Sequence, residues 1–140
     1  MMKWWLKFLF ELMFSALTAK SDKAFEDAVD AAIESLPQFV RDLPNCPKVF
    51  ILECPTKAIT KLCANSPRLA AGLEANYVHP PANMILLYRR NIRRVTPDEL
   101  LALKVKHIVW HEIAHFLGFK EHEIRELGLY ARNAADLPKF

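Results

Sequence analysis

The N-terminal segment of the chain combines a helical pattern with strong hydrophobicity. In MMKWWLKFLFELMFSALTA, polar residues recur every four positions, at Lys3, Lys7, Glu11 and Ser15, which predicts a helix with one polar stripe. Its longest run without a charge is about one third short of the ~20 residues that a membrane span needs. As a secretory signal it has a basic start, but Glu11 interrupts the apolar region and no A-x-A site follows.

Three interpretations of this N-terminal helix stay open. It packs on the rest of the domain, lies in a membrane interface, or serves as a signal. Trp4, Trp5, Phe8 and Leu12 would cover the domain in the first case and face lipid in the second.

A second helical pattern follows in SDKAFEDAVDAAIESLPQFV, residues 21–40. It begins with a Ser or Asp cap and places Phe25, Val29, Ile33 and Leu36 on one face. Pro37 marks its expected end, because the residue before a proline avoids helical backbone angles.

Two short apolar runs predict strands. KVFILE (48–53), between two prolines, is typical of a buried strand, and MILLY (84–88) predicts a second one. The basic run RRNIRR follows directly. The segment from Thr56 to Tyr77 fits a short helix, a loop, or a partial strand near Tyr77.

The best-specified element is the helix predicted over residues 97–117. Thr96 and Glu99 form a capping box, and Pro97 occupies the first turn. Gly118 is a natural C-terminal cap. A short final helix is expected from about Glu121 to Leu127.

Composition sets wide bounds. The length of 140 residues predicts one domain, and the composition of 52% hydrophobic and 25% charged residues is that of a folded globular protein. The net charge of +3 neither requires nor excludes an acidic partner. Cys46, Cys54 and Cys63 are odd in number and form no CxxC pair, so we expect small apolar packing roles in a reducing compartment. A cytoplasmic location follows, with membrane association through the N-terminal helix as the alternative.

The stretch HEIAH, residues 111–115, carries the candidate chemistry. His111 and His115 are four residues apart, so both imidazoles can reach one zinc ion. Glu112 is turned about 100° from His111, a position suited to hydrogen-bonding a water on that ion. Gly118 lets the chain turn back, which makes Glu121 and His122 both available as a third ligand.

The chain at this point resembles the minimal zincin family, small bacterial proteins regarded as candidate zinc metallopeptidases. The family motif HExxHxxGxx(D/H) appears here as HEIAHFLGFKE. Similarity extends over residues 24–128, through AFEDAVDAAIESLP, MILLYRRNIRR and the closing ELG. The segment from Thr56 to Tyr77 diverges from the family, and the first nineteen residues have no counterpart in it.

The resemblance implies an α+β fold, with a small mixed sheet beside a long active-site helix. Residues 1–20 would be a helical extension, and residues 21–140 a zincin-like metallopeptidase domain. Glu121 occupies the family's third-ligand position and is favoured over His122, which lies one residue out of register. The predicted metal site is therefore His111, His115 and Glu121 holding Zn²⁺.

A zinc-dependent peptidase is accordingly the leading functional hypothesis. Zn²⁺ would activate water, Glu112 would act as general base, and the substrate would be a peptide or protein. The strand MILLY, if it lies at the sheet edge, could hold an extended peptide.

Two other classes stay open. One is a non-catalytic metal-stabilised binding protein, indicated by a closed site that uses both Glu121 and His122. The other is a zinc endoribonuclease that binds RNA through RRNIRR. A solvated basic surface explains that run better than RNA binding does, and a known ribonuclease family with an HxxxHxxGxxxH motif lacks the glutamate after its first histidine. His107 is expected on the helix surface or beside a ligand, His79 in a loop, and Trp110 in the core.

Overall fold

The computed structural model describes residues 4–18, 21–56 and 72–128. Its central element is a three-stranded sheet in the order β1-β3-β2. The strands are β1 (Lys48–Leu52), β2 (Ala75–Val78) and β3 (Met84–Tyr88). β1 runs parallel to β3, whereas β2 is antiparallel to it, so the sheet is mixed.

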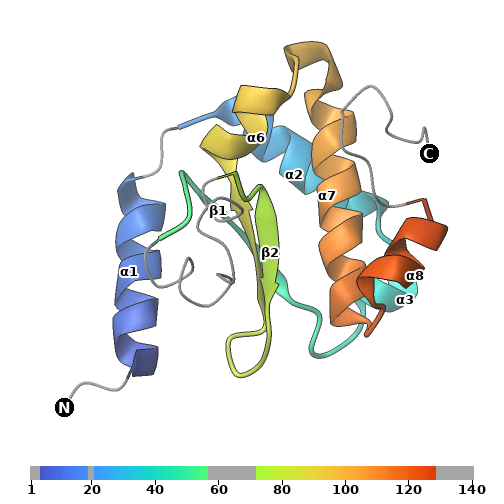
Figure 1. Ribbon diagram of the computed structural model, residues 1–140, viewed down its shortest axis with the longest axis horizontal. Coiled ribbons are helices and arrows are strands. Elements are labelled where there is room, and N and C mark those ends of the chain that lie inside the picture. The colour runs from blue at the N-terminus through green and yellow to red at the C-terminus, as the bar shows by residue number, and fades with distance from the viewer. Residues whose placement is uncertain (1–3, 19–20, 57–71, 129–140) are drawn as a thin grey trace.

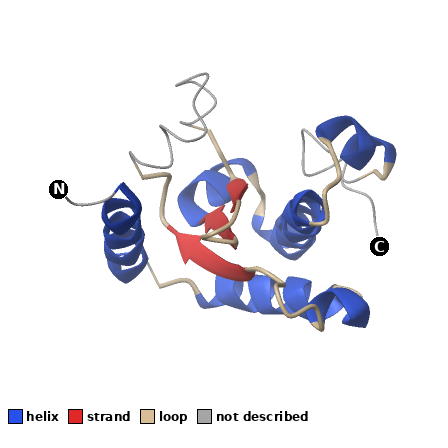
Figure 2. Cartoon of the chain, turned by 90° about the horizontal axis from the view of Figure 1, so that it is seen from below, coloured by secondary structure: helices blue, strands red, loops and turns tan. Residues whose placement is uncertain are grey.

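Helices cover both faces of this sheet (Figure 1). On one side lies α1 (Trp4–Thr18). On the other lie α2 (Lys23–Ser35) and α7 (Leu101–Phe116), followed by α8 (Glu121–Glu126). Shorter helices are α3 (Gln38–Arg41), α6 (Arg89–Val95) and the 3-10 turn η1 (Asp98–Leu100). Figure 2, seen from below, shows the strands with helices on both sides. The predicted α+β fold is confirmed.

The larger core fills the space between the sheet, α2 and α7. Phe25 and Val29 of α2 pack in this core with Val105 and Val109 of α7. Ile85 of β3 belongs to the same core. The apolar spacing of residues 25, 29, 33 and 36 thus predicted the buried face of α2 correctly. Asp22 caps this helix, since its carboxylate accepts the backbone N–H of Phe25 at 3.1 Å.

A smaller core lies on the opposite face of the sheet. Phe8 of α1 is 1% exposed and packs with Leu52, Leu86 and Tyr88. The N-terminal helix therefore packs on the sheet through at least this residue. The structure does not describe the side chains of Trp4, Trp5 and Leu12. Within the described part of the chain, no helix is long and apolar enough to cross a membrane.

Strand order corrects two sequence-based expectations. β3 is the central strand, with residues 85–88 fully buried on both faces, and not a sheet edge. β1 is an edge strand, and Phe50 is 42% exposed, so KVFILE is not a fully buried strand. β2 forms the other edge, at the Tyr77 position where a partial strand was one alternative.

The start of the long helix also differs from the prediction. Thr96 ends α6, donating its backbone N–H to the Arg93 carbonyl, and therefore does not cap α7. Its hydroxyl is buried without a hydrogen-bond partner among the described residues. The turn η1 intervenes, and α7 begins only at Leu101. The predicted Thr96–Glu99 capping box was wrong.

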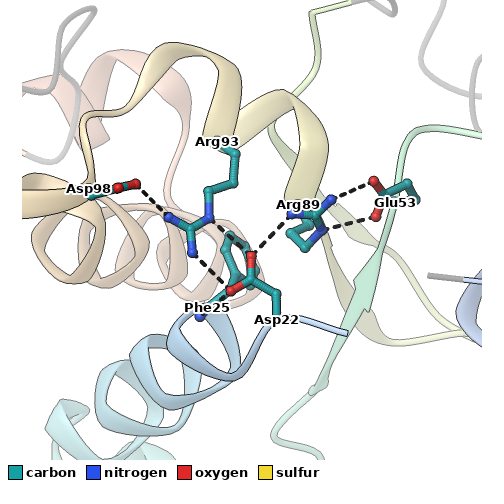
Figure 3. A network of polar contacts seen from close by, with 6 residues as sticks. All are labelled: Asp22, Phe25, Glu53, Arg89, Arg93 and Asp98. Carbon is teal, nitrogen blue, oxygen red and sulfur yellow. Dashed lines mark hydrogen bonds and ion pairs between the residues drawn. The ribbon is translucent and has the colours of Figure 1, made fainter. Parts of the chain in front are cut away.

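The basic run RRNIRR forms α6, and two of its arginines are not part of a solvated surface. Arg89 donates two hydrogen bonds to Glu53, at 3.0 and 2.6 Å, and a third to Asp22. Arg93 bridges Asp22 and Asp98 (Figure 3). This network joins the start of α2, the end of β1 and α6. The expected solvated basic surface is thus wrong for Arg89 and Arg93, because carboxylates from three elements surround them.

The two described cysteines are both free and partly buried. Cys46 packs against the larger core, and burial raises the pKa of its thiol. The expected small apolar packing role is confirmed for Cys46, and Cys63 lies outside the described residues.

Candidate functional site

Two histidines one helical turn apart form the base of the site. His111 and His115 lie on the last turns of α7, with ring centroids 5.0 Å apart in an edge-to-face arrangement. Both side chains are partly exposed, at 16% and 26%. The four-residue spacing therefore produces the shared direction that the sequence predicts.

The turn after α7 brings a third side chain to these histidines. Gly118 has a φ of 96°, and its N–H donates to the His115 carbonyl. Phe119 donates to the Ala114 carbonyl at 3.0 Å, which completes the paired hydrogen bonds of a Schellman C-cap. The chain thereby reverses direction, and α8 begins at Glu121 beside the histidines.

Glu121 places its carboxylate between both imidazoles. Its Oε1 lies 2.7 Å from His115 Nε2 and 3.3 Å from His111 Nε2. Burial favours the neutral acid, but the charges and hydrogen bonds of the two histidines together outweigh it and lower the pKa of Glu121. The carboxylate is thus held ionised where it can act as a ligand.

The neighbours of Glu121 lie elsewhere. Glu123 accepts the backbone N–H of Lys120 at 3.0 Å, so this carboxylate caps the start of α8. His122 is exposed and is not one of the three residues whose donor atoms gather. Glu123, and not Glu121, therefore accepts the capping hydrogen bond at the start of α8.

The three gathered side chains fit a zinc ion. One donor atom each from His111, His115 and Glu121 lies within 4.8 Å of the others. Two imidazoles and one carboxylate are a ligand set of catalytic zinc, which sits about 2.0–2.2 Å from such atoms.

Glu112 lies beside this cluster in a different environment. Its side chain is buried, at 8% exposure, and the backbone N–H of Tyr77 on β2 donates a hydrogen bond to its carboxylate. Burial raises the pKa of Glu112, an effect that His111, His115 and the Tyr77 N–H only partly offset. Glu112 is therefore a stronger base than an ordinary glutamate when ionised.

A cavity of about 270 Å³ opens over these groups. One wall comes from α7 and α8, and the other from the edge strand β2 and the residue just after it. Its lining residues are Ala75, Asn76, Tyr77, His79, Glu112, His115 and Glu121. The strand edge thus faces the same space as Glu112 and two of the three candidate metal ligands, His115 and Glu121.

The sequence alone did not place the β2 wall of this cavity. His79 was expected in a loop, and it does follow β2, but it also lines the cavity and stacks edge-to-face on Tyr77 at 4.9 Å. The Tyr77 hydroxyl donates to Asn83 at 2.7 Å, which fixes the ring. No local motif signals these roles, because Tyr77 and His79 lie more than thirty residues before His111 in the sequence.

Two other residues of α7 support the site from the core side. His107 is buried, at 4% exposure, one turn before His111, and therefore is not a helix-surface residue. Trp110 packs against the larger core, as expected, and against the buried pair Ala114 and Ile124. Its indole N–H donates to the Ser35 hydroxyl at 2.9 Å. This contact joins α7 to the end of α2.

Comparison with protein families agrees with this geometry. A family model described as zincin-like metallopeptidase matches residues 59–130, just over half of the chain. The chain belongs to the zincin-like metallopeptidase family. This family implies zinc binding and hydrolytic chemistry. No curated protein matches the chain.

Proposed function

We propose that the protein is a zinc-dependent peptidase, with His111, His115 and Glu121 as zinc ligands and Glu112 as general base. The observation that carries this proposal is convergence on one cavity. His115 and Glu121 of the three-residue donor cluster, the buried carboxylate of Glu112 and the edge strand β2 all border it. When bound there, zinc would polarise a substrate carbonyl and lower the pKa of the attacking water toward about 7.

The position of Glu112 supports its proposed role in proton transfer. It points into the cavity from the same helix as both histidines, and the Tyr77 N–H fixes its carboxylate. Glu112 would accept a proton from the attacking water and deliver it to the leaving amine. Its burial strengthens it as a base, and its place one residue after His111 keeps it out of the ligand cluster.

The edge strand β2 offers a binding site for an extended substrate. The Tyr88 N–H donates to the Glu74 carbonyl, so Glu74 belongs to a hydrogen-bonded pair with β3. In an antiparallel pair such residues alternate with residues whose backbone groups point away from the partner strand. The backbone groups of Ala75 and Tyr77 therefore point away from β3. The Tyr77 N–H is taken by Glu112, which leaves the outward carbonyls available for a substrate backbone. β2 replaces β3 as the proposed substrate-binding strand, because β2 borders the cavity.

His79 offers a further polar group to the substrate. It lines the cavity but does not belong to the donor cluster. Its imidazole could donate a hydrogen bond to a substrate carbonyl as negative charge develops on that oxygen.

The other two classes have less support. His122 lies outside the donor cluster, so the geometry does not favour a closed four-ligand structural site. Arg89 and Arg93 are engaged by carboxylates, which leaves Arg90 and Arg94 as the exposed arginines of RRNIRR. An RNA-binding surface would need more free cations than these two.

The test is cleavage of a peptide library by the full chain, followed by mass spectrometry. We expect cleavage with zinc, loss of cleavage after chelation, and recovery when zinc is restored. The double variant His111→Ala/His115→Ala, purified in parallel, controls for contaminating proteases. Equal cleavage by this variant, or no cleavage by the zinc-loaded wild type, would contradict the proposal.

A further inference from the structure

The outward face of α1 carries large apolar side chains. Leu6, Phe10, Met13 and Phe14 are 52%, 71%, 64% and 64% exposed, respectively. Their spacing of four, three and one residues places them along one side of the helix, which we call the outer stripe. Phe8, which faces the sheet, is buried on the opposite side. α1 is therefore apolar on its covered face and on its uncovered face.

The strand beside α1 extends this apolar surface. Alternate residues of a strand share a face, so Phe50 and Lys48 point to the same side of the sheet as Leu52. Leu52 packs against Phe8, which identifies that side as the one that α1 covers. Phe50 is 42% exposed there. An aromatic side chain of the sheet thus adjoins the helix.

Charge at this surface is mainly basic. Lys7 is exposed on α1, about 100° around the helix from Leu6, and Lys48 is exposed on β1. Glu11, the acidic residue of α1, follows Lys7 by one turn and lies on that flank of the helix instead of on the outer stripe. The whole chain carries a net charge of +3. An apolar stripe flanked by lysines complements a surface with anionic headgroups above acyl chains.

The length of α1 fixes how it could meet such a surface. Fifteen residues span about 22 Å, which is less than the ~30 Å hydrocarbon core of a bilayer. The helix would therefore lie in the plane of the interface. Its contact with the sheet through Phe8 would hold the rest of the domain against the membrane surface.

We propose that α1 docks in the interface of an anionic lipid bilayer through the outer stripe, with Phe50 beside it. α1 lies on one side of the sheet, and α7 and α8, which carry the candidate metal ligands, lie on the other (Figure 1). Docking would leave the cavity facing water. This proposal is independent of the proposed peptidase activity.

The test is co-sedimentation of the full chain with phosphatidylcholine vesicles, with and without about one third phosphatidylglycerol. We expect binding to the anionic vesicles, weaker binding to the neutral ones, and a further decrease when Lys7 is replaced by Glu. Phe10→Ser/Phe14→Ser should weaken binding to anionic vesicles by at least about tenfold. Leu6→Ser/Met13→Ser is a second variant of the same stripe, and circular dichroism checks that each variant is folded.

Phe39→Ser is the matched control. Phe39 is also 71% exposed, but it lies on α3, away from α1, so its replacement should leave vesicle binding unchanged. Equal binding by wild type and both stripe variants would overturn the proposal, as would an equal loss in Phe39→Ser. A lipid-free dimer that the stripe variants convert to monomer would assign the stripe to a second copy of the chain and would also overturn it.

Discussion

A shift of one residue along the start of α8 would decide which side chain faces His111 and His115. Glu121 meets His111 and His115, His122 is exposed, and Glu123 caps α8. The Schellman turn at Gly118 sets this register, because it fixes where the chain re-enters a helix. A carboxylate and an imidazole next to each other in sequence thus have different surroundings.

Ligand substitutions test this difference. Glu121→Ala should weaken zinc binding by more than about 100-fold, since even an outer hydrogen-bond partner of a ligand is worth roughly 10–100-fold. His122→Ala should bind zinc as the wild type does. Competition with a chromophoric chelator measures both affinities. If only the His122 change releases zinc, the assignment of Glu121 is wrong.

At the scale of elements, Asp22 joins parts of the chain that are far apart in sequence. Its carboxylate caps α2 and accepts hydrogen bonds from Arg89 and Arg93 of α6. The hydrogen bond from Arg93 is the largest influence, and despite partial burial it lowers the pKa of Asp22 from 3.8 to about 2. A folded-state pKa below the unfolded value means that the ionised carboxylate stabilises the fold.

The expected contribution of this carboxylate is about 2 kcal/mol at neutral pH. It should be complete above about pH 5 and lost as pH falls through about 2, because the unfolded chain binds the proton first. Asp22→Asn keeps a capping side chain but removes the charge. Urea unfolding should therefore show a variant about 2 kcal/mol less stable at neutral pH, with the difference shrinking toward pH 2.

Asp27→Asn is the matched control for this measurement. Asp27 pairs with Lys23 on the exposed surface of α2, where an ion pair is worth about 0–1 kcal/mol. An Asp22→Asn variant no less stable than Asp27→Asn would show that the Asp22 network contributes nothing beyond an exposed pair.

Elements with strong local signals were predicted from the sequence, whereas their neighbours in space were not. The apolar spacing of α2 and the β-rich run of β3 depend on nearby residues, so both were found. Thr96 and Glu99 satisfy a local capping pattern, but Thr96 is already used to end α6. Strand order depends on pairing between residues far apart in sequence, so the sequence could not tell whether MILLY lies at an edge or, as β3 does, at the centre.

At the scale of the whole molecule, the sheet separates two surfaces. One face carries α1 with its exposed apolar stripe, and the other supports α2 and α7. The HExxH spacing gave the residues of the candidate site on α7. The opposing wall could not be predicted from this motif, because β2 reaches the site only through its pairing with β3.

The central claim, a peptidase site with Glu112 as its base, depends on one side chain. Glu112→Gln keeps the size of the side chain and removes its ability to accept the proton. The measurement is zinc content and peptide cleavage of this variant beside the wild type. We predict equal zinc per chain and cleavage reduced by at least about 100-fold. Equal cleavage by both proteins would contradict the account.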